Sequence, residues 1–224
     1  MPSLFGLQSL SSAAVLVAIV VTAALIVLVA DWRLALFALA LQYLLLGIFL
    51  ATLVPAPIAM IRLIAGGLAV AILFLSMQTR AGQDRLLFPR HPVAEPETVS
   101  SPARQVFVIG FPFRLMAVAF VVVTMVGLVS SNTFLGLPAR VFFASVWLIA
   151  CGLLTATLSR EALRLGLGIL VFTGGFGVLE IALEGSLLLY GLLNISDLLI
   201  AVVIAHLATV PGDTAEHLRR GDVP

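Results

Sequence analysis

A few polar side chains interrupt an otherwise apolar sequence, and they are the residues that could do chemistry. Asp197 lies in the middle of the last apolar run, and Asn194 and Tyr190 precede it by three and seven residues. On a helix, this spacing puts the three side chains on one face. A carboxyl group held away from water can act as a proton relay by taking up and releasing a proton. The alternative is a structural Asp197 that is hydrogen-bonded to Asn194 or to a facing helix, and both interpretations stay open.

The other polar groups are spread over three further apolar runs. Gln42 and Tyr43 lie near the middle of the second run, Arg62 about one turn inside the third, and Glu180 and Glu184 toward the end of the sixth. We expect Arg62 to extend its charged end to the membrane surface, or else to pair with Glu180 or Glu184. For the two glutamates, which lie nearer the surface, a structural role is favoured over a role in proton transfer.

These positions define a candidate polar axis, with no predicted catalytic or metal-binding residue. Its members are Asp197, Asn194, Tyr190, Glu180, Glu184 and Gln42. The single cysteine, Cys151, excludes an internal disulfide and a multi-cysteine metal or iron–sulfur site. We therefore expect no cofactor.

The composition indicates which kind of element must hold these side chains. Of the 224 residues, 62% are apolar and 10% are charged, against about 45–50% and about 25% in an ordinary soluble domain. So much apolar surface cannot be hidden from water in a chain of this size. The net charge of +1 gives no field that would attract nucleic acid. The sequence predicts an all-α, polytopic membrane protein and excludes a soluble enzyme and a nucleic-acid reader.

Seven segments are long and apolar enough to span a bilayer, which takes about 20 residues as a helix. The predicted spans are Ser12–Ala30, Leu34–Val54, Ile58–Gln78, Leu115–Ser131, Ala139–Leu158, Leu165–Glu184 and Ser186–Val210. They divide the chain into three helices (residues 1–78), a linker (79–114), four helices (115–210) and a tail (211–224). The proline content of the linker favours an extended chain, and residues 105–113 are interpreted as a re-entrant or interfacial lead-in to the fourth span.

The distribution of arginines predicts the orientation. With the N-terminus outside, ten of the twelve basic residues fall in cytoplasmic segments, and two, Arg62 and Arg140, fall elsewhere. Positive residues concentrate on the cytoplasmic side of membrane proteins. The linker and the tail are therefore expected in the cytoplasm, and the inner (plasma) membrane is the expected location.

About half of the chain resembles a known family. The stretch SREALRLGLGILVFTGGFGVLEIAL from Ser159, the stretch NISDLLIAVVIAHL from Asn194 and the second span around Gln42 resemble the hydrogenase-4 component E family. Its relatives are the K component of respiratory complex I and the C component of Mrp-type antiporters. Asp197 falls at the family's aspartate, whereas the family's membrane glutamate falls on Thr173 and a second one near Gly191.

The resemblance implies a non-catalytic membrane subunit of a proton-translocating, hydrogenase-like, complex I-like or Mrp-like assembly. Its partners would be the lipid bilayer and antiporter-like membrane subunits. The subunit would be mainly architectural, with Asp197 as a candidate proton relay. The alternative is a stand-alone transporter of small solutes, and a membrane-embedded enzyme is the least favoured interpretation, because the sequence offers no credible catalytic pair.

Overall fold

The structure of the chain, a computed structural model, describes residues 3–29, 31–87, 111–130, 136–159 and 161–209. This part of the chain contains seven helices and no strand. The helices are α1 (Ser3–Leu28), α2 (Trp32–Leu50), α3 (Ala56–Leu87), α4 (Phe111–Ser130), α5 (Ala139–Leu158), α6 (Ala162–Leu183) and α7 (Leu187–Thr209). Helices suit such an apolar chain, because a helix satisfies its own backbone hydrogen bonds without water.

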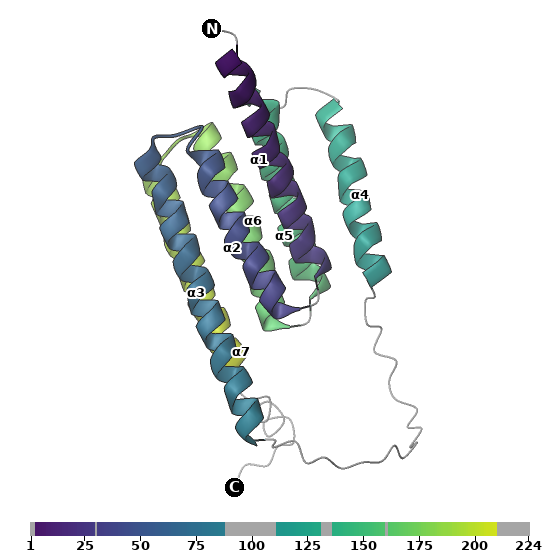
Figure 1. Cartoon of the computed structure of the whole chain (residues 1–224), viewed down its shortest axis with the longest axis vertical. Helices are drawn as coiled ribbons and strands as arrows, with labels where there is room; N and C mark the ends of the chain where they lie inside the picture. The colour runs from purple at the N-terminus through teal and green to yellow at the C-terminus, as the bar shows by residue number, and fades with distance from the viewer. Residues whose placement is uncertain (1–2, 30, 88–110, 131–135, 160, 210–224) are drawn as a thin grey trace.

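The helices form two layers, with successive helices running up and down (Figure 1). The first layer holds α4, α1, α2 and α3, and the second holds α5, α6 and α7. Across the layers, α3 packs on α7, α2 on α6, and α1 on α5, while α4 lies at one edge against α5 and α1. The helices α2, α3, α6 and α7 therefore meet around one interior region.

Glycine allows α5 and α6 to pack backbone against backbone. A Cβ atom on Gly168 would lie 2.5 Å from the backbone nitrogen of Ala156 and 2.7 Å from the carbonyl oxygen of Gly152. Small residues at a helix contact permit this close approach in membranes. The glycine-rich face of α6 is thus used inside the chain, and it does not provide an open surface for a neighbouring protein.

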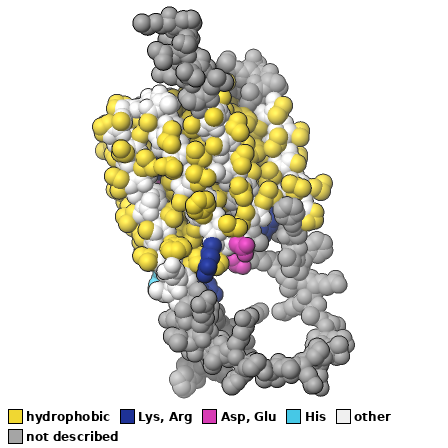
Figure 2. Space-filling view, viewed as in Figure 1, with side chains coloured by type: hydrophobic (Ala, Val, Ile, Leu, Met, Phe, Trp, Pro, Cys, Tyr) yellow, Lys and Arg dark blue, Asp and Glu magenta, His cyan; other side chains and the backbone are white. Residues whose placement is uncertain are grey.

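The surface of the bundle is that of a multi-pass membrane protein. Large apolar side chains are exposed along α3, α4 and α7, among them Ile64, Phe120 and Leu188, and apolar side chains cover the face in Figure 2. Charged side chains gather at the end of the bundle from which α2 rises. Among the described residues, five helices are long and apolar enough to cross a bilayer.

The two remaining predicted spans correspond to α1 and α4, which have 26 and 20 residues. The described apolar parts of α1 and α4 are Ala13–Leu28 and Pro112–Leu128. The predicted fourth span began at Leu115, but α4 begins at Phe111. Proline is well accommodated in the first turn of a helix, because its missing N–H has no partner there in any case. Residues 111–113 therefore belong to α4, while 105–110 and the tail 211–224 lie outside the described residues.

The linker also begins later than its composition suggests. α3 continues to Leu87, nine residues beyond the predicted end of the third span at Gln78. Six of the nine residues in the added stretch TRAGQDRLL are Ala, Arg, Gln or Leu, which are strong helix formers. Hydropathy marks where a helix leaves lipid, and α3 extends past that point.

Candidate functional site

A buried ion pair lies where α2, α3, α6 and α7 meet. Nη1 of Arg62 donates to Oδ2 of Asp197 at 2.6 Å and lies 3.3 Å from Oδ1 of Asn194. The Thr173 hydroxyl donates to Oδ1 of Asp197 at 2.5 Å, and the Tyr43 hydroxyl lies 3.4 Å from Oδ2. These five residues, here called the Arg62–Asp197 cluster, join four helices through one carboxylate and one guanidinium.

Glycine in α3 makes room for the aromatic member of the cluster. The Tyr43 ring lies against Gly66, where a Cβ would be 2.8 Å from Cβ of Tyr43. Gly66 follows Arg62 by one helical turn, and the Arg62 guanidinium lies 5.1 Å from the centre of the Tyr43 ring. A cation at this distance from an aromatic face is attracted by the ring, most strongly when it is desolvated.

Glycine in α6 has the matching role for the guanidinium. A Cβ on Gly174 would lie 3.2 Å from Nη2 of Arg62 and 3.2 Å from a methyl group of Leu46. Thr173, the preceding residue, donates to Asp197 and lies 3.0 Å from the carbonyl oxygen of Leu170. The sequence Thr-Gly thus places a donor for the carboxylate beside a gap for the cation.

Both charges of the cluster are withdrawn from solvent. The exposed fractions of the side chains are 1% for Arg62 and 0% for Asp197. Each charge alone would be expensive to bury, and the pair is tolerated because the charges neutralise each other and are hydrogen-bonded further. Nη2 of Arg62 has no hydrogen-bond partner among the described residues. The arrangement is a neutral, interhelical polar contact that α2, α3, α6 and α7 share.

A row of polar side chains continues from the cluster toward the start of α7. The Asn194 side-chain amide donates to the carbonyl oxygen of Tyr190 at 2.8 Å. Tyr190 is buried, and its hydroxyl has no hydrogen-bond partner in the described part of the chain. The Tyr190 ring lies near Gly177 of α6, where a Cβ would be 3.9 Å from a ring carbon. Glu180 follows Gly177 by about one turn. Glu180 is also buried, and no described side chain hydrogen-bonds to it.

Fully buried polar side chains continue on one side of Asp197 only, although the half-buried Ser76 hydroxyl of α3 donates to the carbonyl oxygen of Ala205 on the other side, at 2.9 Å. On that other side, the buried positions of α7 are Ala201, Ile204 and Ala208. In α3, the buried positions that follow Arg62 toward the same end include Ala69 and Leu73. Within the described residues, the polar row therefore begins near the α6–α7 turn and ends at the ion pair.

The structure brings together only part of the predicted polar axis. Asp197 and Asn194 belong to the cluster, and Tyr190 shares their helix face. Glu184 is exposed at the end of α6. Gln42 is buried, but its side-chain oxygen contacts the Thr22 hydroxyl of α1. Gln42 thus joins α1 to α2, apart from the Arg62–Asp197 cluster.

The sequence interpretation of Arg62 was wrong. Arg62 neither extends to the surface nor pairs with Glu180 or Glu184, because its partner is Asp197. Depth counted along the helices placed Arg62 near the surface and Asp197 near the centre, but a long arginine side chain bridges that difference. The useful signal was that oppositely charged residues within membrane spans tend to pair. Thr173, an uncharged residue, carried no comparable signal.

In comparisons with known proteins, no family model matches the chain, and no curated protein or solved structure matches it significantly.

Proposed function

We propose that this chain is a non-catalytic membrane subunit of a proton-translocating assembly of the hydrogenase-like, complex I-like or Mrp-like kind. The observation that carries the proposal is the buried Arg62–Asp197 cluster, which ties four helices together at the aspartate that the family resemblance singles out. The position at which the resemblance places a membrane glutamate is Thr173, and that side chain contacts the same aspartate.

The geometry favours an architectural role for this cluster over conduction through the chain alone. A proton that reached Asp197 would have to displace the Arg62 guanidinium, which lies 2.6 Å from the carboxylate. The polar row that includes Tyr190 and Asn194 supplies an approach from one side, and apolar residues follow on the other. Asp197 thus lies where the row of polar side chains ends inside the bundle. The complete proton route would then run through neighbouring subunits.

The proposed topology has seven spans, the N-terminus outside and the C-terminus in the cytoplasm, in the inner (plasma) membrane. The described helices alternate in direction (Figure 1), and α2, α4 and α6 begin at the same end as the last turns of α3. Arg33, Arg114, Arg164 and Arg80 therefore lie toward one end of the bundle. This grouping supports that end as the cytoplasmic one.

Reporter fusions test the topology. Reporters placed after Arg90 and after Arg220 should both report the cytoplasm, and a reporter at the N-terminus should report the outside. An outside signal from either of the first two positions would contradict the proposed orientation.

Purification under native conditions tests the function. A tagged chain should co-purify with large antiporter-like subunits, identified by mass spectrometry. A stable, monodisperse chain without partners that moves solutes in liposomes would instead establish the stand-alone transporter.

The role of Asp197 is tested in vesicles that contain the intact complex. Proton uptake is measured for Asp197→Asn and for the control Glu184→Gln, which removes an exposed carboxylate outside the cluster. If Asp197 has only an architectural role, Asp197→Asn should lower the amount of complex but not the uptake per complex. A lower uptake per intact complex for this variant alone would make Asp197 a proton relay.

A further inference from the structure

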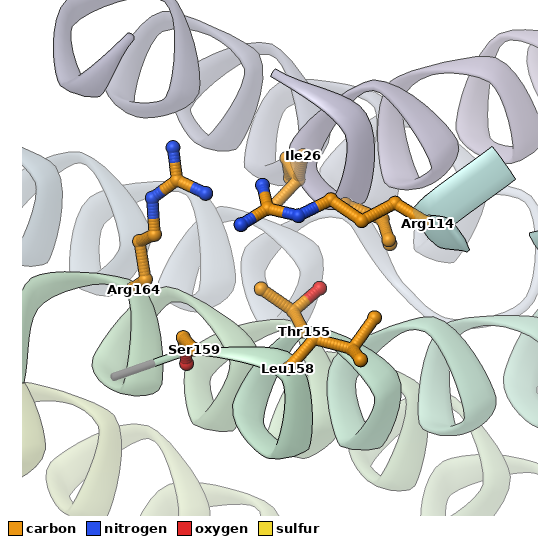
Figure 3. A pocket seen from close by; sticks show the side chains of 7 residues that line it. Ile26, Arg114, Thr155, Leu158, Ser159 and Arg164 are labelled. Carbon is orange, nitrogen blue, oxygen red and sulfur yellow. The ribbon is translucent and has the colours of Figure 1, made fainter. Parts of the chain in front are cut away.

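Two arginines from different helices converge on a small pocket at one end of the bundle. Arg114 of α4 and Arg164 of α6 point their guanidinium groups toward each other, beside Ile26 of α1 and above Thr155 and Ser159 (Figure 3). The cavity between the lining side chains measures about 10 Å³, which is room for one water-sized group. One phosphate oxygen has this size, so a phosphate could insert one oxygen and keep the remainder outside.

The pocket places two positive charges close together. Arginine is always charged in proteins, and two like charges facing each other at a partly buried site repel. Arg164 pairs with Glu161 at 3.6 Å, but the side chain of that glutamate is 75% exposed. No carboxylate of the described residues forms an ion pair with Arg114, and its buried Nε has no hydrogen-bond partner there.

The two hydroxyl groups of the pocket already donate to backbone carbonyl oxygens, so the guanidinium groups are the donors that can face a ligand. The Thr155 hydroxyl donates to the carbonyl oxygen of Cys151 at 2.7 Å, and the Ser159 hydroxyl donates to that of Ala156 at 3.1 Å. Arg164 also donates from Nη2 to the carbonyl oxygen of Val29 at 3.1 Å, which fixes its position. Guanidinium groups match the oxygens of a phosphate through paired hydrogen bonds.

We propose that Arg114 and Arg164 bind the phosphate group of a membrane phospholipid. The pocket lies at the end of the apolar helices, where lipid headgroups lie, and Arg114 is in the first turn of α4. On the flank next to Arg114, α4 exposes a row of apolar side chains (Leu115, Val122 and Val126) at 49, 41 and 63%. Acyl chains can follow this row while the phosphate sits between the arginines. The proposal is independent of the proposed function.

Native mass spectrometry of the full, delipidated chain in mild detergent tests this site. The probes are dioleoyl phosphatidylglycerol, dioleoylglycerol, which has the same chains without phosphate, and inorganic phosphate. The chain should bind one phosphatidylglycerol more tightly than dioleoylglycerol. Arg114→Gln should weaken this binding at least about ten-fold, since it removes the charge-assisted hydrogen bonds of this guanidinium to the phosphate. Arg114→Lys, which keeps the charge but not the paired donors, should weaken it less.

The matched control is Arg33→Gln, which removes an exposed arginine from the same end of the bundle. It should bind phosphatidylglycerol as the unmodified chain does. Equal loss of binding in Arg33→Gln and Arg114→Gln would overturn the proposal. The lipid would then be held by the overall positive charge of this end of the bundle and not by the pocket. Equal binding of dioleoylglycerol would also overturn it. Binding of inorganic phosphate, without a preference for phosphatidylglycerol over dioleoylglycerol, would assign the pocket to a soluble anion. This result would refute the lipid site.

Discussion

Breaking the Arg62–Asp197 ion pair from one side should destabilise the protein more than removing both charges together. Asp197→Asn keeps the size of the side chain and can still accept from Thr173, but it leaves the Arg62 cation buried without its counter-charge. Removing one partner of a buried pair costs about 3–5 kcal/mol. Arg62→Met leaves the carboxylate equally unbalanced and should cost a similar amount.

The double variant Arg62→Met with Asp197→Leu isolates the pairing. No charge then remains in the cluster, and Thr173 keeps the Leu170 carbonyl oxygen as an acceptor. The Tyr43 hydroxyl loses its contact with the carboxylate, which should cost about 1–3 kcal/mol. The double variant is therefore expected to be more stable than either single variant, with a coupling energy of at least about 3 kcal/mol.

Equilibrium unfolding in mixed micelles, with the fraction of SDS as the denaturant variable, measures these free energies of unfolding. Glu184→Gln is the control for loss of an acid, and a change within about 0.5 kcal/mol is expected because that side chain is exposed. Single penalties that simply add in the double variant would refute the ion pair as the basis of the cluster.

Four further substitutions test individual packing contacts and hydrogen bonds. Gly168→Ala should destabilise the protein by about 1–3 kcal/mol, because its Cβ meets the backbone of α5; Gly67→Ala, with open space around its Cβ, should be neutral or stabilising by up to about 1 kcal/mol in the same unfolding assay. Trp147→Phe removes the indole donor 3.2 Å from a carbonyl oxygen of α1 and should lower the melting temperature, with a loss of about 1–3 kcal/mol. Thr173→Val keeps the shape but removes a donor to Asp197, and a loss of about 1 kcal/mol in the unfolding free energy is expected.

The helices were largely predictable from the sequence, because lipid leaves an apolar chain few alternatives to a helix. The ends of the helices were less predictable. At Gln78 the apolar run stops while α3 continues, and at Phe111 a helix begins before the apolar run that was taken as its start. Hydropathy reports the change of solvent, whereas a helix ends where its backbone hydrogen bonds end.

The site was predictable as a set of polar residues but not as a set of contacts. The spacing of Asn194 and Asp197 on one helix face follows from helix geometry alone. Their partners come from three other helices, and helix order in a bundle is not encoded in the spacing along one helix. Gln42 and Tyr43 are neighbours in sequence, but they face α1 and the cluster respectively, because adjacent residues on a helix point in different directions.

The ion pair gives α2, α3, α6 and α7 a fixed register that apolar contacts supply only weakly. In lipid, apolar side chains are solvated almost equally well by acyl chains and by a neighbouring helix, so helix association depends on close packing and polar contacts. The Tyr43 ring fits only because Gly66 has no Cβ, and a Cβ on Gly174 would crowd the Arg62 guanidinium at 3.2 Å. Sliding one helix by a turn would separate the two charges and place a side chain in a glycine gap. The cluster therefore selects one register because every alternative leaves a buried charge unpaired.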